Sequence, residues 1–141
     1  MSAPGVANAA DSLLSQGKVT SASSIENAGT PAANATDGNT GTRWSSAFAD
    51  PQWLQVDLGA NANISQVSLN WEAAYAKTFT IQTSPTGTGN WTDITPVTSG
   101  QAGVQTLTVS GSGRFVRMNG LTRATGYGYS LFEFQVYGAF G

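Results

Sequence analysis

The chain has 141 residues and a formal net charge of −2 at pH 7; 40% of its residues are hydrophobic and only 10% are charged. This length fits one domain with a continuous core. Because the sequence contains no His and no Cys, it excludes Ser-His-Asp and thiol catalysis, His-ligated zinc, iron–sulfur centres and disulfides. The six basic residues form no basic stripe, so we expect no nucleic-acid partner. The sequence has no apolar run of about 18 residues, so we expect no segment of it to span a membrane.

Residues 1–10 are mostly small, and they lack the charged start and leucine-rich centre of a signal peptide. We interpret them as a flexible leader or linker, ahead of a single domain over residues 11–141. Both ends of the sequence are typical of a piece cut from a longer protein, and such a piece is expected to be monomeric.

Ser and Thr make up almost a quarter of the chain, and Gly, Asn and aromatic residues are frequent. This composition favours short strands and turns. About eight stretches with period-two alternation, separated by Gly, Pro and Asn turns, predict an all-β sandwich or jelly roll. The expected strands are an alternating stretch within 12–23, then 53–58, 64–71, 78–83, 91–94, 104–109, 113–118 and 131–137.

Two expectations concern which side chains are buried. Alternation in the last strand places Phe132, Phe134 and Val136 on the face opposite Leu131 and Glu133. The tryptophans are the second case: Trp53 and Trp71 are expected in the core because they lie in strands, and Trp44 is expected to be structural.

Four ordered sequence blocks, 35–46, 52–59, 114–118 and 130–138, carry a family resemblance. Together they resemble the discoidin domain, also called the coagulation factor V/VIII type C domain, which includes the family 32 carbohydrate-binding modules of bacterial enzymes. The resemblance covers residues 11–138 and implies an all-β, eight-stranded jelly-roll β-sandwich of the discoidin type.

A narrower likeness lies in 44–53, 70–75 and 126–130, which are similar to discoidin modules of bacterial chitosanase and β-1,3-glucanase enzymes. This resemblance implies a non-catalytic module that brings a secreted hydrolase, its parent domain in the same chain, to a polysaccharide. Chitosan or glucosamine oligosaccharides are the first expected ligand. Neutral β-1,3-glucan and galactose-type sugars are the second.

Loop aromatics and scarce loop charges are the candidate ligand-binding residues. Aromatic faces cover the apolar C–H faces of sugars, while carboxylates and guanidinium groups bond hydroxyl and ammonium groups. Each of these side chains could instead be a loop plug or an ordinary solvated charge. Because Tyr127 and Tyr129 flank Gly128, at least one of them should face solvent. The candidates are Glu26, Arg43, Phe48, Glu72, Tyr75, Lys77, Tyr127 and Tyr129.

The loop Asp37-Gly-Asn-Thr-Gly-Thr42 is the candidate metal site. Its pattern departs from the EF-hand, and by itself it is also compatible with a plain Asx turn. The family resemblance implies a structural, non-catalytic Ca²⁺ here, and hard cations of this kind take about six to eight oxygens. The implied ligands are the side chains of Asp37 and Thr42, the carbonyls of Ala35 and Asn39, and Glu133.

Glu133 gives an independent reason to expect a partner, because an unpaired carboxylate in an aromatic strand is costly. A salt bridge to Arg114 or Arg117 would satisfy it as well as a metal ion would.

Two further function classes stay open from the sequence. Glu26 and Glu72 could serve as the carboxylate pair of a small glycosidase or lyase. Phe48 could serve as the apolar spike of an adhesion or lipid-binding domain, although such domains also use basic residues that are rare here.

Overall fold

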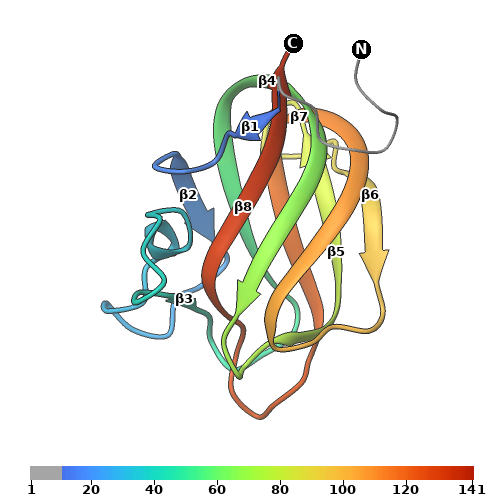
Figure 1. Cartoon of the computed structure of the whole chain (residues 1–141). Helices are drawn as coiled ribbons and strands as arrows, with labels where there is room; N and C mark the ends of the chain where they lie inside the picture. The colour runs from blue at the N-terminus through green and yellow to red at the C-terminus, as the bar shows by residue number, and fades with distance from the viewer. Residues whose placement is uncertain (1–10) are drawn as a thin grey trace.

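The computed structural model describes residues 11–141, and the leader or linker expected at residues 1–10 lies outside this range. The described residues confirm the all-β prediction, with one short 3-10 helix as the exception (Figure 1). No helix within 11–141 has the length and hydrophobicity that a membrane crossing requires. The elements are β1 (Ser12–Leu13), β2 (Val19–Ala22), η1 (Ala32–Ala35), β3 (Trp44–Ser45), β4 (Gln52–Trp71), β5 (Ala76–Ser84), β6 (Thr92–Val97), β7 (Gly103–Arg123) and β8 (Ser130–Phe140).

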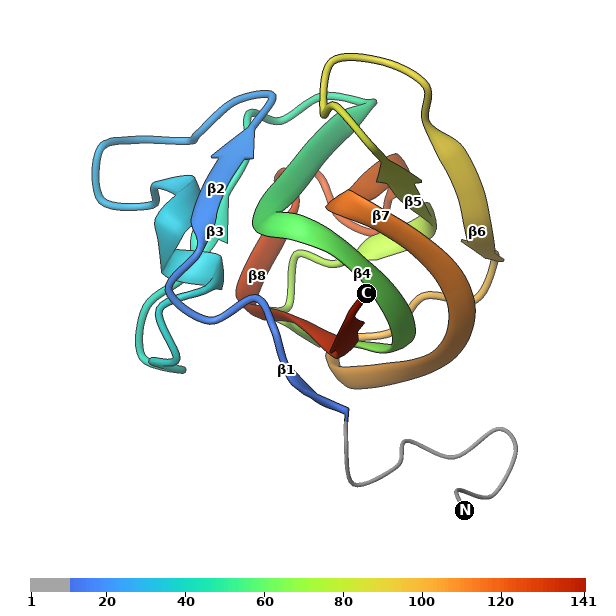
Figure 2. The ribbon, with the colours of Figure 1, turned by 90° about the horizontal axis from the view of Figure 1, so that it is seen from above.

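The two longest strands, β4 and β7, are antiparallel and pair along most of their lengths. Gln52–Asp57 of β4 pairs with β7 residues 115–120, and Ala62–Trp71 pairs with 103–113. β2 and β5 extend the first of these two regions, and β8 extends the second, so each long strand contributes to both layers of the sandwich. Figures 1 and 2 show both strands running to the end of the molecule near the C-terminus, bending there and returning.

The bend in β4 has a local cause. Pairing with β7 is interrupted between Asp57 and Ala62, and Gly59 in this gap has φ of 91°, a conformation that favours glycine. The Gly59 N–H donates a 2.8 Å hydrogen bond to Asp57 Oδ1, which closes the turn. The two strands predicted over 53–58 and 64–71 are therefore the two legs of one bent strand, and the same holds for 104–109 and 113–118 in β7.

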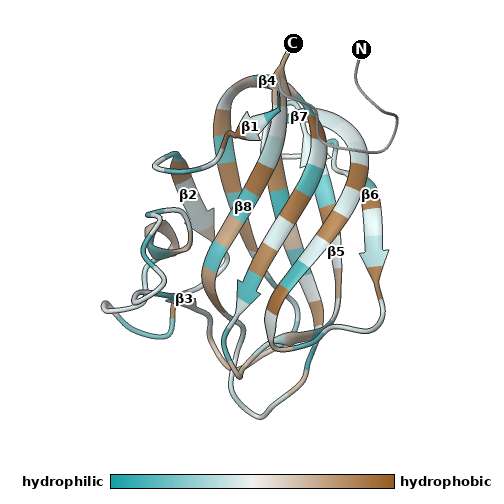
Figure 3. Cartoon of the chain, in the orientation of Figure 1, coloured by the Kyte–Doolittle hydropathy of each residue, from teal (hydrophilic) through white to brown (hydrophobic). Residues whose placement is uncertain are grey.

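The core lies between the two layers and takes side chains from both legs of β4. Leu54 and Val56 of the first leg, and Val67 and Leu69 of the second, are completely buried in one cluster. Brown bands along the inner strands in Figure 3 follow this alternation. The predicted alternation of β4 is confirmed.

The prediction for the faces of β8 was wrong at its start. Leu131, and not Phe132, shares the core with Phe134 and Val136. The pairing of β8 with β4 skips Phe132, which makes it the extra residue of a β-bulge and reverses the faces on its N-terminal side. Glu133 therefore lies on the opposite face from Leu131 and points away from the core cluster.

The prediction for Trp53 was also wrong, whereas those for Trp44 and Trp71 are confirmed by their burial. Trp53 alternates out of phase with Leu54, so its side chain lies on the outer face of the sheet and is half-buried. There the Arg117 guanidinium lies 4.2 Å from the centroid of the Trp53 ring, an arrangement that gives cation–π attraction.

Gly138 in β8 tests how closely this strand packs against β4, its neighbour in the sheet. A Cβ atom at this position would lie 2.0 Å from the backbone oxygen of Asn63, so Gly138→Ala is expected to lower the free energy of unfolding by about 3 kcal/mol. Urea unfolding followed by tryptophan fluorescence measures this. Gly89→Ala, where the new Cβ meets nothing within 4 Å, is the control, and equal midpoints for the two variants would contradict the packing described here.

Candidate functional site

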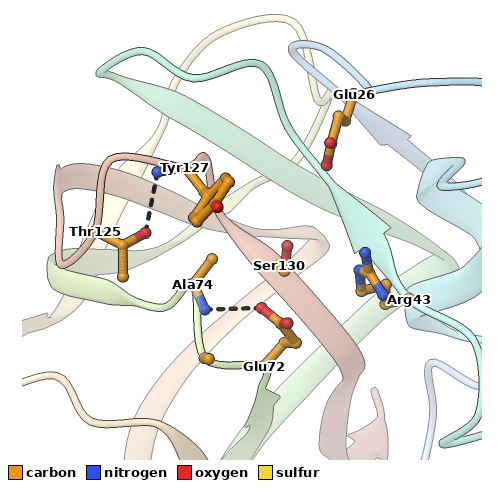
Figure 4. A pocket seen from close by; sticks show the side chains of 8 residues that line it. Glu26, Arg43, Glu72, Ala74, Thr125, Tyr127 and Ser130 are labelled. Atoms are coloured by element: carbon orange, nitrogen blue, oxygen red, sulfur yellow. Dashed lines mark hydrogen bonds between the residues drawn. The ribbon is translucent and has the colours of Figure 1, made fainter.

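A cavity of about 410 Å³ opens where the segments between β2 and β3 meet the turn after β4 and the β7–β8 loop. It brings together four of the predicted ligand-binding residues, which are far apart in the sequence. Figure 4 shows their side chains arranged around the opening. The residues that line it are Glu26, Arg43, Glu72, Ala73, Ala74, Thr125, Tyr127 and Ser130.

The short strand β3 positions two of the charged side chains. The backbone N–H of Glu26 donates to the Ser45 carbonyl at 2.7 Å, and Arg43 Nε donates to Ser45 Oγ at 3.1 Å. The Ser45 hydroxyl also shares a hydrogen bond of 2.6 Å with the hydroxyl of Ser130 on β8, in the buried floor below the cavity. Ser45 thus connects Glu26 and Arg43 on one side of the cavity to Ser130, the first residue of β8, on the other.

Glu72 is held by the turn that follows β4. Its backbone N–H donates to the Ser130 carbonyl at 3.0 Å, and its Oε1 accepts a 2.8 Å hydrogen bond from the Ala74 N–H (Figure 4). This hydrogen bond fixes the side chain through Oε1, so that Oε2 can accept a hydrogen bond from a ligand.

The cavity carries two carboxylates against one guanidinium. Within residues 11–141, the ion pairs closer than 4 Å involve neither Arg43, Glu26 nor Glu72. The three charged side chains therefore do not form ion pairs with one another. Because carboxylates outnumber guanidinium groups, the potential in the cavity is negative, which favours a cationic ligand.

Tyr127 and Phe48 form an exposed aromatic pair at the edge of the cavity. Their rings meet edge to face, with centroids 5.6 Å apart and planes at 90°. Tyr127 is 66% exposed and Phe48 is 50% exposed, so both rings offer apolar surface to a ligand. Phe48 does not line the cavity itself but continues the aromatic surface beyond Tyr127.

The other three predicted residues do not line the cavity. Tyr75 is half-buried against the core, and Lys77 is exposed on β5. Tyr129 is completely buried, and its hydroxyl donates to Asp50 Oδ1, so its inclusion among the ligand-binding candidates was wrong. Burial, followed by this hydrogen bond, raises the pKa of Tyr129 well above its ordinary value, which keeps the hydroxyl protonated as a donor. The expectation that Tyr127 or Tyr129 faces solvent is confirmed by Tyr127.

The predicted metal loop lies against Glu133. Asp37 Oδ1 accepts a hydrogen bond from the Asn39 N–H at 2.9 Å, and Oδ2 accepts one from the Thr42 hydroxyl at 2.6 Å. The Gly38 N–H donates to Glu133 Oε1 at 3.1 Å. Glu133 is only 4% exposed, and its Oε2 is buried without a hydrogen-bond partner among the described residues.

The carboxyls of Glu133 and Asp37 interact directly. Burial, and then the neighbouring Asp37 carboxylate, raise the pKa of Glu133 to about 7. Burial opposes ionisation of Asp37, but the hydrogen bonds that its carboxylate accepts from Thr42 and Asn39 outweigh it and lower the pKa of Asp37. Without a cation, the pair therefore holds its proton on Glu133.

The alternative of a salt bridge to Glu133 is wrong. Arg114 pairs with Asp57 at 2.8 Å, and Arg117 donates to Gln55 Oε1 instead. Both arginines therefore have partners other than Glu133.

The metal loop fits a hard cation. A buried carboxylate oxygen without a partner, next to a second carboxylate, is the arrangement that a cation would neutralise. Within residues 11–141 no group of three His, Cys, Asp or Glu gathers around one point. A metal ion would therefore need neutral oxygens as well, and the loop offers the Ala35 and Asn39 carbonyls and the Thr42 hydroxyl.

Residues 34–118, more than half of the chain, match the family described as NedA-like, galactose-binding domain, of the F5/F8 type C group. The chain belongs to this family. None of the curated proteins that were compared matches the chain.

Solved structures of carbohydrate-binding modules are similar to this chain. Chitosan-binding module 1 of a chitosanase/glucanase from Paenibacillus sp. IK-5 is 47% identical over 90% of this chain and 99% of that one, with a TM-score of 0.87. Chitosan-binding module 2 of the same enzyme, in complex with chitotriose, is 46% identical over 89% of this chain and 99% of that one, with a TM-score of 0.85.

A more distant relative shows the shared fold only. The family 32 carbohydrate-binding module of Clostridium perfringens NanJ, in complex with galactose, is 23% identical over 90% of this chain and 98% of that one, with a TM-score of 0.79. The predicted jelly-roll sandwich of the discoidin type is confirmed by this and the preceding matches.

Four residues that line the cavity of this family member were not predicted, namely Ala73, Ala74, Thr125 and Ser130. Ala73, Ala74 and Thr125 are close in sequence to Glu72 or Tyr127, and that proximity is a signal that could have found them. Ser130 reaches the cavity through its pairing with Ser45, a contact that follows from the fold rather than from any local pattern.

Glu133 predicts a pH dependence of stability in metal-free solution. The folded protein holds the Glu133 proton more tightly than the unfolded chain, so the stability from this group is present below the ordinary pKa of 4.5 and is lost as pH rises to about 7. This loss is on the order of 3 kcal/mol. Glu133→Gln, which stays neutral, should lose less stability between pH 4.5 and 7.5 in urea unfolding with a chelator present. Parallel curves for the two proteins would contradict this electrostatic account.

Proposed function

We propose that this chain is a non-catalytic carbohydrate-binding module that holds glucosamine oligosaccharides of the chitosan type in the cavity between Glu26, Glu72 and Tyr127. The observation that carries the proposal is the excess of carboxylate in that cavity, where Glu26 and Glu72 face a single guanidinium and none of the three forms an ion pair within residues 11–141. The 46–47% identity to two chitosan-binding modules supports the same ligand.

Each group in the cavity has a chemical counterpart on such a ligand. A glucosamine ammonium forms charge-assisted hydrogen bonds with Glu26 or Glu72, which a neutral sugar cannot match. Arg43 donates to ring hydroxyls, and its N–H groups are oriented by Ser45. The exposed ring of Tyr127 covers the apolar C–H face of a sugar ring.

The wider setting follows from the same proposal. A binding module joined to a secreted hydrolase raises the local concentration of the enzyme at its polysaccharide without adding chemistry. The chitosan-binding modules that resemble this chain derive from a chitosanase/glucanase, and this relationship supports a parent hydrolase of related type.

We also propose that the loop of Asp37 and Glu133 binds one structural Ca²⁺. The ion would replace the proton shared by the two carboxyls and join the 36–42 loop to β8. It would supply stability rather than chemistry, because the loop is separate from the cavity that binds sugar.

Neutralising either cavity carboxylate tests the proposed ligand. Glu26→Gln and Glu72→Gln should each weaken binding of the glucosamine trimer about tenfold, since each removes one charge-assisted hydrogen bond while keeping the shape of the side chain. Calorimetric titration measures the affinity, and added salt should weaken wild-type binding.

Two controls make this titration specific. Asp93→Asn removes the same charge from β6, outside the cavity, and should leave affinity unchanged. The N-acetylglucosamine trimer lacks the ammonium and should bind more weakly than the glucosamine trimer. Equal binding of both trimers, or tight binding of a β-1,3-glucan trimer alone, would refute chitosan as the ligand, and release of reducing ends by the pure protein would refute a non-catalytic role.

Calcium should raise the thermal stability of the protein at pH 7.5, because an ion that binds the folded chain preferentially stabilises it. Differential scanning calorimetry with calcium or with a chelator measures the shift, and equilibrium dialysis counts bound ions. Glu133→Gln should abolish both the shift and the binding. A wild-type protein that binds no calcium in dialysis would refute the metal site.

A further inference from the structure

We propose that Arg123, Asp50 and Tyr129 are positioning residues that join the loop carrying Phe48 to the loop carrying Tyr127. The two exposed rings then act as one platform for the part of an oligosaccharide that extends beyond the charged cavity. This inference rests on the proposed function and extends it to residues that touch no sugar.

The aromatic pair needs support from outside itself. Tyr127 and Phe48 are both at least half exposed, and they meet each other edge to face rather than in a packed core. Their positions therefore depend on the backbones that carry them, in the β7–β8 loop and in residues 46–51 between β3 and β4.

Arg123, the last residue of β7, contacts both loops, one through backbone carbonyls and the other through the Asp50 side chain. Its Nη1 donates to the carbonyls of Gly126 and Tyr127 at 3.4 and 3.3 Å. Its Nε donates to Asp50 Oδ2 at 3.3 Å, in the loop on the other side. A guanidinium can reach these three acceptors because its donors point in several fixed directions, which a lysine ammonium cannot reproduce.

Tyr129 anchors the same junction to the core. Its buried hydroxyl donates to Asp50 Oδ1, the oxygen that Arg123 does not use. Its ring lies so close to Gly120 of β7 that a Cβ there would be 2.4 Å from a ring carbon. Its backbone N–H donates to Ser46 Oγ at 2.9 Å.

Gly128 shows that the two loops also meet backbone to backbone. A Cβ at Gly128 would lie 2.6 Å from the Ser46 carbonyl oxygen and 2.7 Å from that of Ala47. The loops are thus docked at Gly128 and cross-linked through Asp50, and neither contact involves Glu26 or Glu72. A platform held in place before the ligand arrives loses less conformational entropy on binding.

The test compares ligands of different length. Arg123→Ala should weaken binding of the glucosamine trimer about fivefold while leaving binding of glucosamine itself unchanged, because the monomer fills only the charged cavity. Tyr129→Phe, which removes a single hydroxyl, should act in the same direction with a smaller effect. Arg114→Ala, which breaks the ion pair with Asp57 on β4, is the matched control and should change neither affinity.

A double-mutant cycle separates positioning from general destabilisation. In a Tyr127→Ala background, Arg123→Ala should cause no further loss of trimer affinity, because the platform is already gone. Additive losses, an equal loss for monomer and trimer, or tighter trimer binding on removal of the Arg123 charge would each overturn the proposal.

A measurement on the ligand-free protein keeps this inference distinct from the proposed function. Backbone ¹⁵N order parameters should fall together at residues 47–49 and 125–127 in Arg123→Ala, and stay unchanged in Arg114→Ala. Unchanged order in both loops would overturn the positioning role even if the trimer binds. Failure of the wild-type protein to bind any glucosamine oligosaccharide would overturn the proposed function, and with it the platform.

Discussion

The candidate site depends on the paired bending of β4 and β7. Both strands run to the far end of the molecule, turn there and come back, and they stay paired on both legs. Both ends of each strand are therefore at the same end of the molecule. This places the loop before β4, the turn after β4 and the loop after β7 side by side, and these segments carry Phe48, Glu72 and Tyr127.

Different residues of the sandwich form the core and line the candidate site. The core fills the space between the legs, while the cavity floor is a small polar contact between Ser45 and Ser130. A backbone hydrogen bond to Ser45 holds the Glu26 segment, and a hydrogen bond from the Ala74 N–H holds the Glu72 side chain. The proposed preference for a cationic sugar rests on the excess of carboxylate over guanidinium in the cavity. The second carboxyl pair, Asp37 and Glu133, does not line the cavity, and its proposed role is to hold a structural ion.

Local sequence patterns predicted the features that depend on alternation within a strand. They failed where contacts with distant strands decide which side chains are buried. The predicted period-two alternation of 53–58 agrees with the burial of Leu54 and Val56, and at least one of Tyr127 and Tyr129 was correctly expected to face solvent. The bulge at Phe132 and the burial of Tyr129 escaped prediction, because both are set by contacts with distant strands. The scarcity of Glu, its position in loops beside aromatic residues and the family resemblance together selected Glu26 and Glu72 as candidates, whereas the position of Ser130 in the cavity required the fold.

We propose that sugars bind at the end of the sandwich where Glu26, Glu72 and Tyr127 converge. Titration of the glucosamine trimer into ¹⁵N-labelled protein tests this most directly, because each backbone amide reports on its own surroundings. The account predicts chemical-shift changes concentrated in residues 24–26, 43–48, 72–75 and 124–130. Changes centred instead on the outer face around Trp53 and Arg117, or no change at millimolar trimer, would contradict it.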